Sequence, residues 1–545
     1  ALLYRLAHTH PFICRFGGFF HDPQKMYYVF EFCAGGDSQA VNIVMTELDE
    51  TLAQIRDDVR PPTPVPPEFP IQVDEGRQTV TVAAGIPQRM LLEYLSEYGE
   101  GWTLPAFSYF IDQSIGGAVA TGTHGSSFRH GSLSSQVESL RLMVANGTVL
   151  DISAESDPHL FKAAGVSVGR LGILMDLTLR IVPDRLVERV TEDMDLLTFA
   201  EQVKAVQDAY TLAIGGGGDA DEDEVQAALR GLEETQSFWH PQQNIVWRTD
   251  YRVVEDGTAD TTVGVEDTAD TADDDAVRRR FEYPRLDYDP FSVPDAISTQ
   301  SVTPAGVYDQ VPNDNAVGPT PAITKNPANW GRIYPSILRG TVTPGEYAAN
   351  KAYVTMSEQV NQNQAGSDPY DQYEAAVPLE IAGDCLLGLN DLVYGAGANS
   401  TVREGFRTPP LIRFVGAEDF YLSPSYGTPV MYVNLEDHLS LSTGTKNEGF
   451  DTVMRYLLDE CDGRLHWGKA GWPDLLPDFD GAKVYPKWCD FGCAVAELDP
   501  TSKFQADAAD VWRWTATQDG YVVGDFWASC CDADGFSGAC VCAPR

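Results

Sequence analysis

Apolar and polar positions alternate most regularly between residues 71 and 183. The β-branched run Thr79–Val82 comes shortly before Gly85, which predicts a strand followed by a turn. Four apolar residues then recur at helical spacing and predict a helix over residues 88–98. They are Met90, Leu91, Leu92 and Leu95. This part of the chain therefore predicts a compact unit of mixed α and β structure.

Two later patterns complete this unit. Residues 137–145 are followed by a turn at Asn146-Gly147 and by further apolar residues from Val149, which predicts a hairpin. Residues 171–183 predict a final strand that Pro183 ends, because proline cannot donate a hydrogen bond to a sheet.

The segments before this unit follow other patterns. Residues 41–45 predict a strand, and residues 46–58 predict a short helix. Residues 60–70 contain six prolines, which exclude a helix and indicate an extended linker or surface loop.

The segments after it are less regular. Residues 184–440 hold two acidic tracts, Gly215–Glu224 and Glu255–Asp275, which predict disordered surface insertions because they are too polar to be buried. An acidic metal site is the alternative, but the spacing matches no calcium loop. Residues 441–515 return to an aromatic-rich globular pattern, and residues 516–545 predict a separate tail.

Composition excludes several classes of protein. The 545 residues include 80 Asp and Glu against 38 Lys and Arg, so the net charge is −42. Such a chain repels nucleic acid and anionic membranes. No apolar run approaches the length of about 20 residues that a membrane-spanning helix needs. No signal-peptide pattern is present, the start at Ala1 predicts a truncated or mid-gene beginning, and the compartment is not indicated.

The ten cysteines are too sparse for a disulfide scaffold. Four of them cluster in the tail, at Cys530, Cys531, Cys540 and Cys542. They suit zinc or disulfides, but their spacing fits no standard zinc pattern and no histidine is near, so a disordered tail is expected.

The chemistry is concentrated in residues 112–126, where glycines and small residues alternate with hydroxyls and one histidine. Small residues let the backbone approach a flat ligand closely. Exposed N–H groups in such a loop attract anions. The loop matches neither G-x-G-x-x-G nor a P-loop. It indicates a site for an aromatic cofactor with a diphosphate, and a simple glycine-rich turn is the alternative.

The motifs Gln-Ser-Ile-Gly-Gly-Ala at 113–118 and Ala-Thr-Gly-Thr-His-Gly-Ser at 120–126 resemble the FAD-binding domain of the vanillyl-alcohol-oxidase superfamily. Arg-Leu-His-Trp-Gly-Lys at 464–469 and Leu-Ser-Pro at 422–424 resemble the aldonolactone (D-arabinono-1,4-lactone and L-gulonolactone) oxidase and alditol oxidase branch. The motifs occur in the order that this branch requires, and the resemblance covers residues 71–183 and 370–515 well and 230–255 weakly.

The resemblance implies site residues. It places FAD against Ser114, Gly117, Thr121, Gly122, Thr123, His124, Gly125, Ser126, Ile173 and His466. It also implies catalytic roles for Lys469, Arg413 and His466 and no metal. A fixed ammonium at Lys469 would stabilise the charge that hydride transfer leaves on flavin, and a solvated lysine is the alternative. His466 could equally be a packed core histidine.

The chain departs from the family at several positions. Arg413 matches the arginine of a Glu-x-Arg pair, but the glutamate position is Leu411, and neither Glu380 nor Glu418 can be placed in the site. Several members of the family carry a histidine close to the position of Asn434. The residue that would act as the catalytic base is therefore not identified. Ser108 matches a position that separates oxidases from dehydrogenases, so the acceptor is O2 or another molecule.

The N-terminal part departs most. The family's pyrophosphate loop, rich in arginine and glycine, is missing, and residues 1–40 resemble a fragment of an AGC-group protein kinase. The catalytic motifs of a kinase are absent, which excludes a working kinase. This segment predicts a fusion or a mis-joined gene model.

The resemblance implies an α+β chain, with a split PCMH-type FAD-binding domain at residues 41–185 and 441–515. An α+β cap domain on an antiparallel sheet would span residues 186–440. The implied enzyme is an FAD-dependent oxidoreductase that acts on the CH–OH group of a sugar-acid lactone. The alternatives are a flavin oxidase of a polyol or other alcohol, or a non-catalytic chain that cannot hold FAD.

Overall fold

The computed structural model describes a little over half of the chain, in several stretches. These are residues 13–21, 26–32, 71–99, 101–108, 111, 113–215, 221–254, 344–349, 371–398, 402–403, 406, 409–437, 448–469, 475–476, 481–499 and 503–504. The predicted elements at 41–58, the proline-rich segment, the second acidic tract and the cysteine tail lie outside the described residues. Near the N-terminus, β1 (Ile13–His21) and β2 (Met26–Phe32) form an antiparallel pair.

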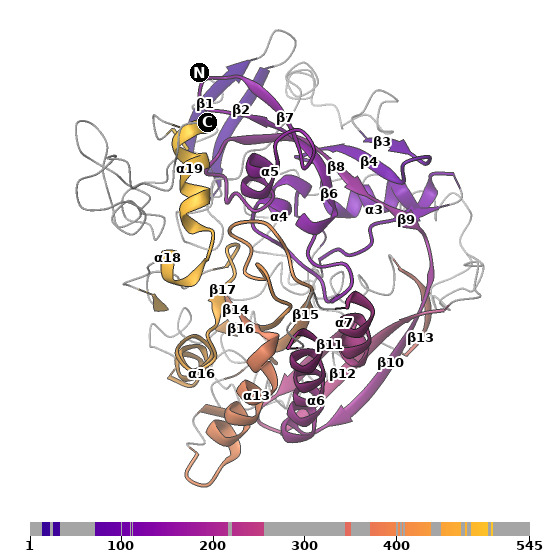
Figure 1. Ribbon diagram of the computed structural model, residues 1–545, viewed down its shortest axis with the longest axis vertical. Coiled ribbons are helices and arrows are strands. Elements are labelled where there is room, and N and C mark those ends of the chain that lie inside the picture. Colours follow the sequence, from indigo (N-terminus) through magenta and orange to yellow (C-terminus); the bar gives the residue numbers. More distant parts are fainter. Residues whose placement is uncertain are drawn as a thin grey trace, which may run out of the picture.

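A five-stranded antiparallel sheet organises residues 71–183, in the order β3-β4-β8-β6-β7. Its strands are β3 (Ile71–Asp74), β4 (Thr79–Ala83), β6 (Val137–Met143), β7 (Val149–Ser153) and β8 (Ile173–Arg180). It is accompanied by α3 (Gln88–Glu97), α4 (Ile115–Ala120), the 3₁₀ turn η1 (Ser134–Gln136), α5 (Pro158–Ala164) and the short pair β5 (Trp102–Thr103) and β9 (Val182–Pro183). These elements occupy the upper half of Figure 1.

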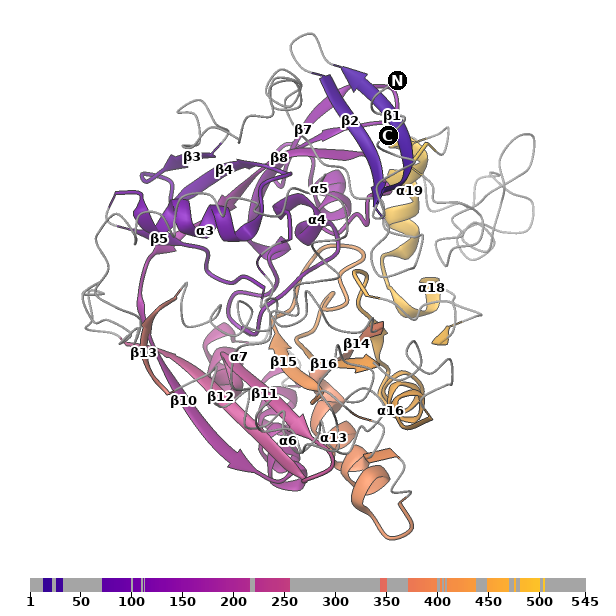
Figure 2. The ribbon, with the colours of Figure 1, turned by 180° about the vertical axis from the view of Figure 1, so that it is seen from behind.

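A larger sheet of eight strands forms the second half of the molecule, and all of its pairs are antiparallel. In spatial order its strands are β13 (Gly345–Ala348), β10 (Leu186–Met194), β12 (Ile245–Val253), β11 (Thr235–His240), β15 (Leu411–Val415), β16 (Val430–Asp437), β14 (Asp371–Pro378) and β17 (Arg464–Leu465). Figure 2 shows this sheet below the first one from the opposite side.

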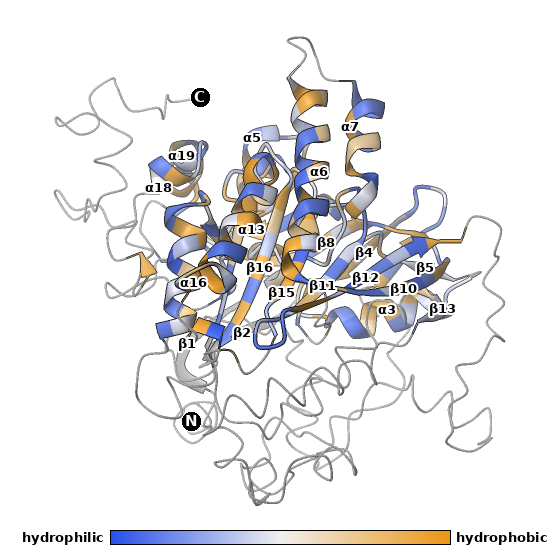
Figure 3. Ribbon diagram, turned by 90° about the horizontal axis from the view of Figure 1, so that it is seen from below, coloured by the Kyte–Doolittle hydropathy of each residue, from blue (hydrophilic) through white to orange (hydrophobic). Residues whose placement is uncertain are grey.

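Amphipathic helices accompany the larger sheet. They are α6 (Leu196–Ile214), α7 (Glu222–Leu229) with the 3₁₀ turn η2 (Arg230–Leu232), α13 (Leu379–Tyr394) and α16 (Glu448–Asp459). Figure 3 shows bands of hydrophobic residues along α6 and α13. The two helices cross closely at Gly383, where a Cβ would lie 2.3 Å from the Cα of Lys204. Glycine is therefore required at this crossing.

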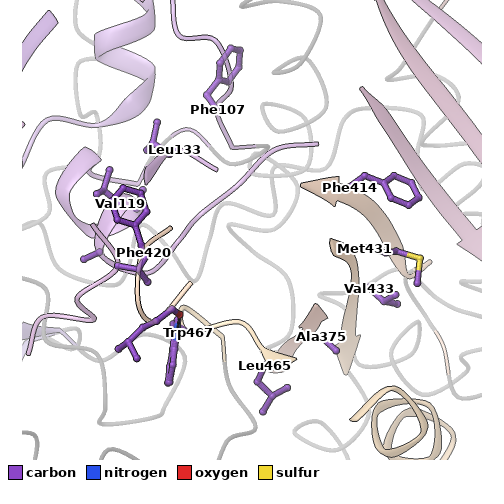
Figure 4. Close-up of a cluster of buried hydrophobic side chains, with 14 of the residues drawn as sticks. Phe107, Val119, Leu133, Ala375, Phe414, Phe420, Met431, Val433, Leu465 and Trp467 are labelled. Carbon is purple, nitrogen blue, oxygen red and sulfur yellow. Dashed lines mark hydrogen bonds between the residues drawn. The ribbon is translucent and has the colours of Figure 1, made fainter. Parts of the chain in front are cut away.

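The last helices of the described part are α18 (Gly481–Val484) and α19 (Trp488–Leu498), and α19 packs on α5 of the first half. One continuous cluster of buried apolar residues runs through both halves. Figure 4 shows part of it, with Val119 and Leu133 from the first half and Phe414, Met431 and Val433 from the larger sheet. The central strand β15 is buried along its whole length, so both faces of the sheet are covered there.

Several sequence predictions are confirmed. The strand at residues 79–82, the helix at 88–98 and the hairpin after residue 137 appear as β4, α3 and the β6–β7 pair. The predicted last strand is interrupted, because β8 ends at Arg180 and the two-residue β9 ends at Pro183. The mixture of helices and antiparallel sheets confirms the α+β class.

The prediction of a disordered first acidic tract was wrong for its last residues. Asp221 caps α7 by accepting a hydrogen bond from Asp223 N, and Glu222, Asp223 and Glu224 form its first turn. Acidic side chains stabilise a helix N-terminus, where the unpaired N–H groups carry partial positive charge. The same charges that argued against burial therefore favour the start of a helix.

The structure also contains disulfide bonds that the sequence analysis did not predict. Cys385 of α13 bonds to Cys461, which lies just after α16, across a separation of 76 residues. Cys489 and Cys493 of α19 are disulfide-bonded as well. Within the described part of the chain, no helix is both long enough and apolar enough to cross a membrane.

Candidate active site

The glycine-rich loop begins with Ser114, whose side chain accepts a hydrogen bond from Gly117 N at the start of α4. The loop continues past the helix with Gly122 at a positive φ of 67°, a conformation that favours glycine. Gly117 is exposed, while Thr121 and Thr123 are half-buried and share a hydrogen bond of 3.2 Å between their hydroxyls. The loop thus presents backbone and small polar side chains at its surface.

The end of the loop is anchored on the larger sheet. Gly125 approaches Phe107 so closely that a Cβ would lie 2.3 Å from its carbonyl oxygen. The hydroxyl of Ser126 donates to the Thr235 carbonyl and accepts from Phe414 N at 2.9 Å. The Ser126 hydroxyl therefore forms hydrogen bonds with the backbones of β11 and β15. These bonds join the loop to the sheet that carries Arg413.

Four polar side chains share one face of that sheet. Arg413 of β15 is opposite Tyr432 of β16, and Asn434 of β16 is opposite Glu374 of β14. Because side chains alternate along a strand, Tyr432 and Asn434 point to the same side. The register therefore brings residues from three strands to one place.

Arg413 and Glu374 form a buried ion pair across β16. A guanidinium nitrogen of Arg413 contacts the Glu374 carboxylate, and the side chains are 8% and 0% exposed. Burial alone would raise the pKa of Glu374, but the charge of Arg413, with His124 and Lys469, holds it well below its usual range. Glu374 is therefore an ionised carboxylate in a dry environment.

His124 of the loop is part of the same cluster. Its ring stacks on Tyr432, with centroids 3.7 Å apart and planes at 19°. Its Nε2 lies 3.5 Å from Oε1 of Glu374, and its carbonyl accepts from Arg413 at 3.1 Å. Burial lowers the pKa of His124, and the charge of Arg413 lowers it further. The imidazole is thus neutral beside a carboxylate.

His466 and Lys469 complete the cluster from the segment after β17. The backbone N–H of His466 donates to the Glu374 carbonyl, and its ring lies 5.4 Å from that of His124. Burial lowers the pKa of His466 to about 3, and its Nδ1 accepts from Gly468 N. The half-buried Lys469 donates to Oε1 of Gln372, and enclosure lowers its pKa.

Four buried polar atoms of this cluster have no hydrogen-bond partner among the residues that the structure describes. Two are donors, Nε of Arg413 and Nδ2 of Asn434, and one is an acceptor, Oε2 of Glu374. The fourth is Nε2 of His124. Leaving such groups unpaired costs about 1–3 kcal/mol each. Unpaired donors and acceptors in one buried place indicate a site for a polar ligand.

The structure thus brings together Arg413, His466, Lys469 and His124 of the predicted site. Ile173 lies elsewhere, at the start of β8 in an apolar cluster with Met143 and Met175. Ser108 is buried, and its hydroxyl donates to Oε1 of Gln88 at 3.1 Å. Leu411 is on the sheet face of the cluster, opposite Asn434.

Sequence reasoning missed Glu374 and considered two other carboxylates. Glu418 accepts hydrogen bonds from Ser132 and Ser423 in a buried network, and Glu380 accepts from Thr428. Glu374 alone of the three contacts Arg413. One signal was available, because a charged residue in the apolar strand Tyr-Glu-Ala-Ala-Val-Pro, at 373–378, needs a buried partner.

Two family models match the chain. The model described as FAD binding domain matches residues 70–153, and the model described as D-arabinono-1,4-lactone oxidase matches residues 329–512. His124 lies in the first match, and Glu374, Arg413, His466 and Lys469 lie in the second. The chain is related to the aldonolactone oxidases.

Individual aldonolactone oxidases agree with this relationship. D-arabinono-1,4-lactone oxidase of Eremothecium gossypii is 44% identical over 115 residues, which is 21% of each chain. L-gulonolactone oxidase of Scyliorhinus torazame is 24% identical over 440 residues, which is 80% of this chain and 81% of that one. The match to the first relative therefore spans only about a fifth of that relative's length.

Among solved structures, cholesterol oxidase from B. sterolicum matches with a TM-score of 0.49 and 14% identity. This match covers 80% of this chain and 82% of that chain.

The family matches indicate FAD as the cofactor, and the described residues fit such a group. The loop offers exposed backbone at Gly117 and half-buried hydroxyls at Thr121 and Thr123. Unpaired buried polar atoms lie behind it on the sheet, with the Lys469 ammonium beside them. A flat, polar and anionic ligand suits this set of donors.

Proposed function

We propose that this chain oxidises a CH–OH group of a sugar-acid lactone, with FAD as its cofactor. The observation that carries the proposal is the buried cluster in which the Arg413–Glu374 pair joins the glycine-rich loop through His124. When bound, FAD supplies the acceptor of the hydride, and O2 or another acceptor takes the electrons afterwards.

The loop residues hold the cofactor in this proposal. They are Ser114, Gly117, Thr121, Gly122, Thr123, His124, Gly125 and Ser126, with His466 as a further contact. Ile173, outside the polar cluster at the start of β8, would contact the cofactor through its backbone. Their small side chains permit close approach of a flat ring, and their N–H groups suit phosphate oxygens. Since Ser126 already bonds to two backbone groups of the sheet, it acts mainly by holding the loop in place.

Lys469 stabilises negative charge at the cofactor. A cation held in a dry site is effective because little solvent screens it and no reorganisation is needed when charge develops. Gln372 holds the ammonium through one hydrogen bond. His466 supports the turn that carries Lys469, because its Nδ1 accepts from the N–H of Gly468.

Arg413 and Glu374 bind the substrate. One guanidinium nitrogen and one carboxylate oxygen are engaged between them, which leaves Nε and Oε2 for hydroxyl or carbonyl groups. Asn434 adds a third group, the unpaired Nδ2. A ligand with several adjacent oxygens satisfies all three, and sugar-acid lactones and polyols have this pattern.

A second candidate is the oxidation of a polyol or another alcohol. Leu411 favours it, because an apolar side chain occupies the face of β15 beside Arg413, where a carboxylate was expected. The cluster then lacks the carboxylate expected on that side for a lactone, which favours a different alcohol as the substrate.

The two halves of the molecule correspond to a division of labour in this proposal. In this proposal residues 41–185 and 441–515 form the FAD-binding domain and residues 186–440 form the cap, with α16 and β17 of the 441–515 segment packed against the larger sheet. Residues 1–40 and 516–545 are a kinase-like fragment and a tail outside this division. The eight-stranded sheet supplies the cap side of the pocket.

The test begins with the purified chain incubated with FAD and then desalted. Flavin absorption bands should remain with the protein, and D-arabinono-1,4-lactone or L-gulono-1,4-lactone should bleach them without air. Xylitol and sorbitol test the second candidate under the same conditions. Lys469→Met should slow bleaching, whereas the matched surface variant Lys162→Met should leave it unchanged.

Each outcome has a definite meaning. Bleaching by polyols but not by lactones would replace the first candidate with the second. Retained flavin that no lactone or alcohol reduces would reject both, and loss of all flavin on desalting would show a chain that is not an enzyme by itself.

A further inference from the structure

The position of one proton on His124 follows from its surroundings. Nδ1 of this ring lies 2.9 Å from the carbonyl oxygen of Gly125. A carbonyl oxygen only accepts, so Nδ1 must carry the single N–H of a neutral imidazole. Burial and the charge of Arg413 lower the pKa of His124 and keep the ring neutral. Nε2 is therefore a bare acceptor.

This bare nitrogen faces a second acceptor. Nε2 of His124 lies 3.5 Å from Oε1 of Glu374, which is an ionised carboxylate. Among the described residues, neither Nε2 of His124 nor Oε2 of Glu374 has a hydrogen-bond partner, while Oε1 of Glu374, the atom that faces Nε2, accepts from Arg413. Two lone pairs that face each other in a dry place repel, and one added proton between them would give Nε2 a partner and remove this repulsion.

Neither partner is free to turn away. Tyr432 stacks flat on the His124 ring at 3.7 Å, and Arg413 donates both to the His124 carbonyl and to the Glu374 carboxylate. His466 also faces the pair, with its ring 5.4 Å from that of His124. Among the described residues, the charge of Lys469 also acts on Glu374.

A metal ion is a poorer occupant than a proton. Among the described residues, ligand atoms of His124, Glu374 and His466 lie within 4.8 Å of one another, close enough to share an ion. However, Arg413 contacts the only carboxylate of the group, and Lys469 adds a second positive charge nearby. Nδ1 of His466 is also engaged by Gly468 N.

We propose that the His124–Glu374 pair is the proton acceptor for the substrate hydroxyl group. The inference rests on the proposed function, in which a CH–OH group becomes a carbonyl. The O–H bond breaks and its proton binds between Nε2 of His124 and Oε1 of Glu374. The C–H hydrogen leaves with both electrons to the FAD, and the C–O bond becomes double.

The neighbouring donors suit this step. As the proton leaves, negative charge grows on the substrate oxygen, and Arg413 Nε and Asn434 Nδ2 are two buried donors without an acceptor. Donors held ready for a developing charge stabilise it strongly in a dry site. The same cluster thus offers a place for the proton and for the oxygen that loses it.

The first test needs no catalysis. Nitrogen NMR of the full chain labelled with ¹⁵N-histidine reports which ring nitrogen carries hydrogen, and His124→Asn identifies the resonances of His124 by their loss. At neutral pH, Nε2 should be of the bare type and Nδ1 of the N–H type. Nε2 that already carries hydrogen at neutral pH would overturn the proposal.

Glu374→Gln provides a second assignment if His124→Asn does not fold. Its side-chain amide can donate to Nε2, so the Nε2 resonance of His124 should shift towards a hydrogen-bonded value. The matched control His159→Gln, on α5, should leave the His124 resonances in place. A Glu374→Gln spectrum in which no bare nitrogen moves would show that the two groups do not face each other.

The second test is the pH profile of kcat/KM for the lactone. Protonation of His124 removes the acceptor, so activity should fall on the acid side, below the ordinary histidine pKa of about 6.5. Glu374 raises the pKa of His124, so Glu374→Gln should move this limb to lower pH. It should also reduce kcat/KM by about 10²–10⁴-fold, the usual contribution of a general base.

The two proposals fail differently. A wild-type chain that oxidises no lactone or alcohol removes the proposed function, while the NMR result still decides the protonation of the pair. Active wild type with Glu374→Gln within twofold of it, and with an unmoved acid limb, would show that another group takes the proton.

Discussion

The buried pair of Arg413 and Glu374 permits a quantitative test of how the site is held together. The side chains of Arg413 and Glu374 are 8% and 0% exposed. Replacing either residue by methionine therefore leaves the other as a buried charge without its ion-pair partner. An uncompensated buried charge of this kind costs about 3–5 kcal/mol of unfolding free energy. Replacing both residues removes both charges, so the double variant should lose no more than either single variant.

The assay is urea unfolding of the full chain without flavin, followed by circular dichroism, for the wild type, the two single variants and the double variant. Lys162 and Asp419 provide a matched control, since their ion pair of 2.8 Å is largely exposed, at 38% and 75%. The same cycle there should change stability by only about 0–1 kcal/mol. The reasoning is refuted if the double Arg413–Glu374 variant loses the sum of the two single losses.

Three further results are expected. Lys469→Met should slow flavin reduction by about 10²–10³-fold with unchanged flavin content, measured by anaerobic stopped flow, and a change below threefold would contradict its role. Cys385→Ala should lower stability by about 4.5 kcal/mol, because the disulfide to Cys461 closes 76 residues, and thermal melts with and without reductant check this. Burial, with the charges of nearby arginines, lowers the pKa of His130 from 6.5 to about 4. The folded chain therefore resists this protonation, and about 3 kcal/mol of stability is lost as the pH falls from 6.5 to 4. His130→Gln should flatten the fall in melting temperature over that range, and an unchanged slope would contradict the assignment.

Local patterns predicted the elements of the first half well. The alternation at residues 79–82 and the helical spacing at 88–98 each arise within one element, where the burial of one face decides the structure. The prediction of disorder failed at residues 221–224 for a local reason. Their charges oppose burial, but they also stabilise a helix N-terminus, which carries partial positive charge.

The candidate site was only partly predictable, because its geometry depends on strand order. His124, Arg413, His466 and Lys469 were found through motifs, but Glu374 is 39 residues from Arg413 and on another strand. Only the order β15-β16-β14 brings the two together, and no local spacing encodes that order. The disulfide between Cys385 and Cys461 was not predicted for the same reason, because no local spacing shows that the two cysteines meet.

The loop histidine and the carboxylate that it faces come from two distant segments of the chain, one from residues 70–153 and the other from residues 329–512. Recombining genes that encode related chains is therefore constrained by the contact between His124 and Glu374. A hybrid that inherits one segment from one parent and the other segment from a second parent combines two groups whose positions must agree within about 0.5 Å. Exchange within the intervening stretch leaves them together, so viable hybrids should have their crossovers in pairs on either side of that stretch.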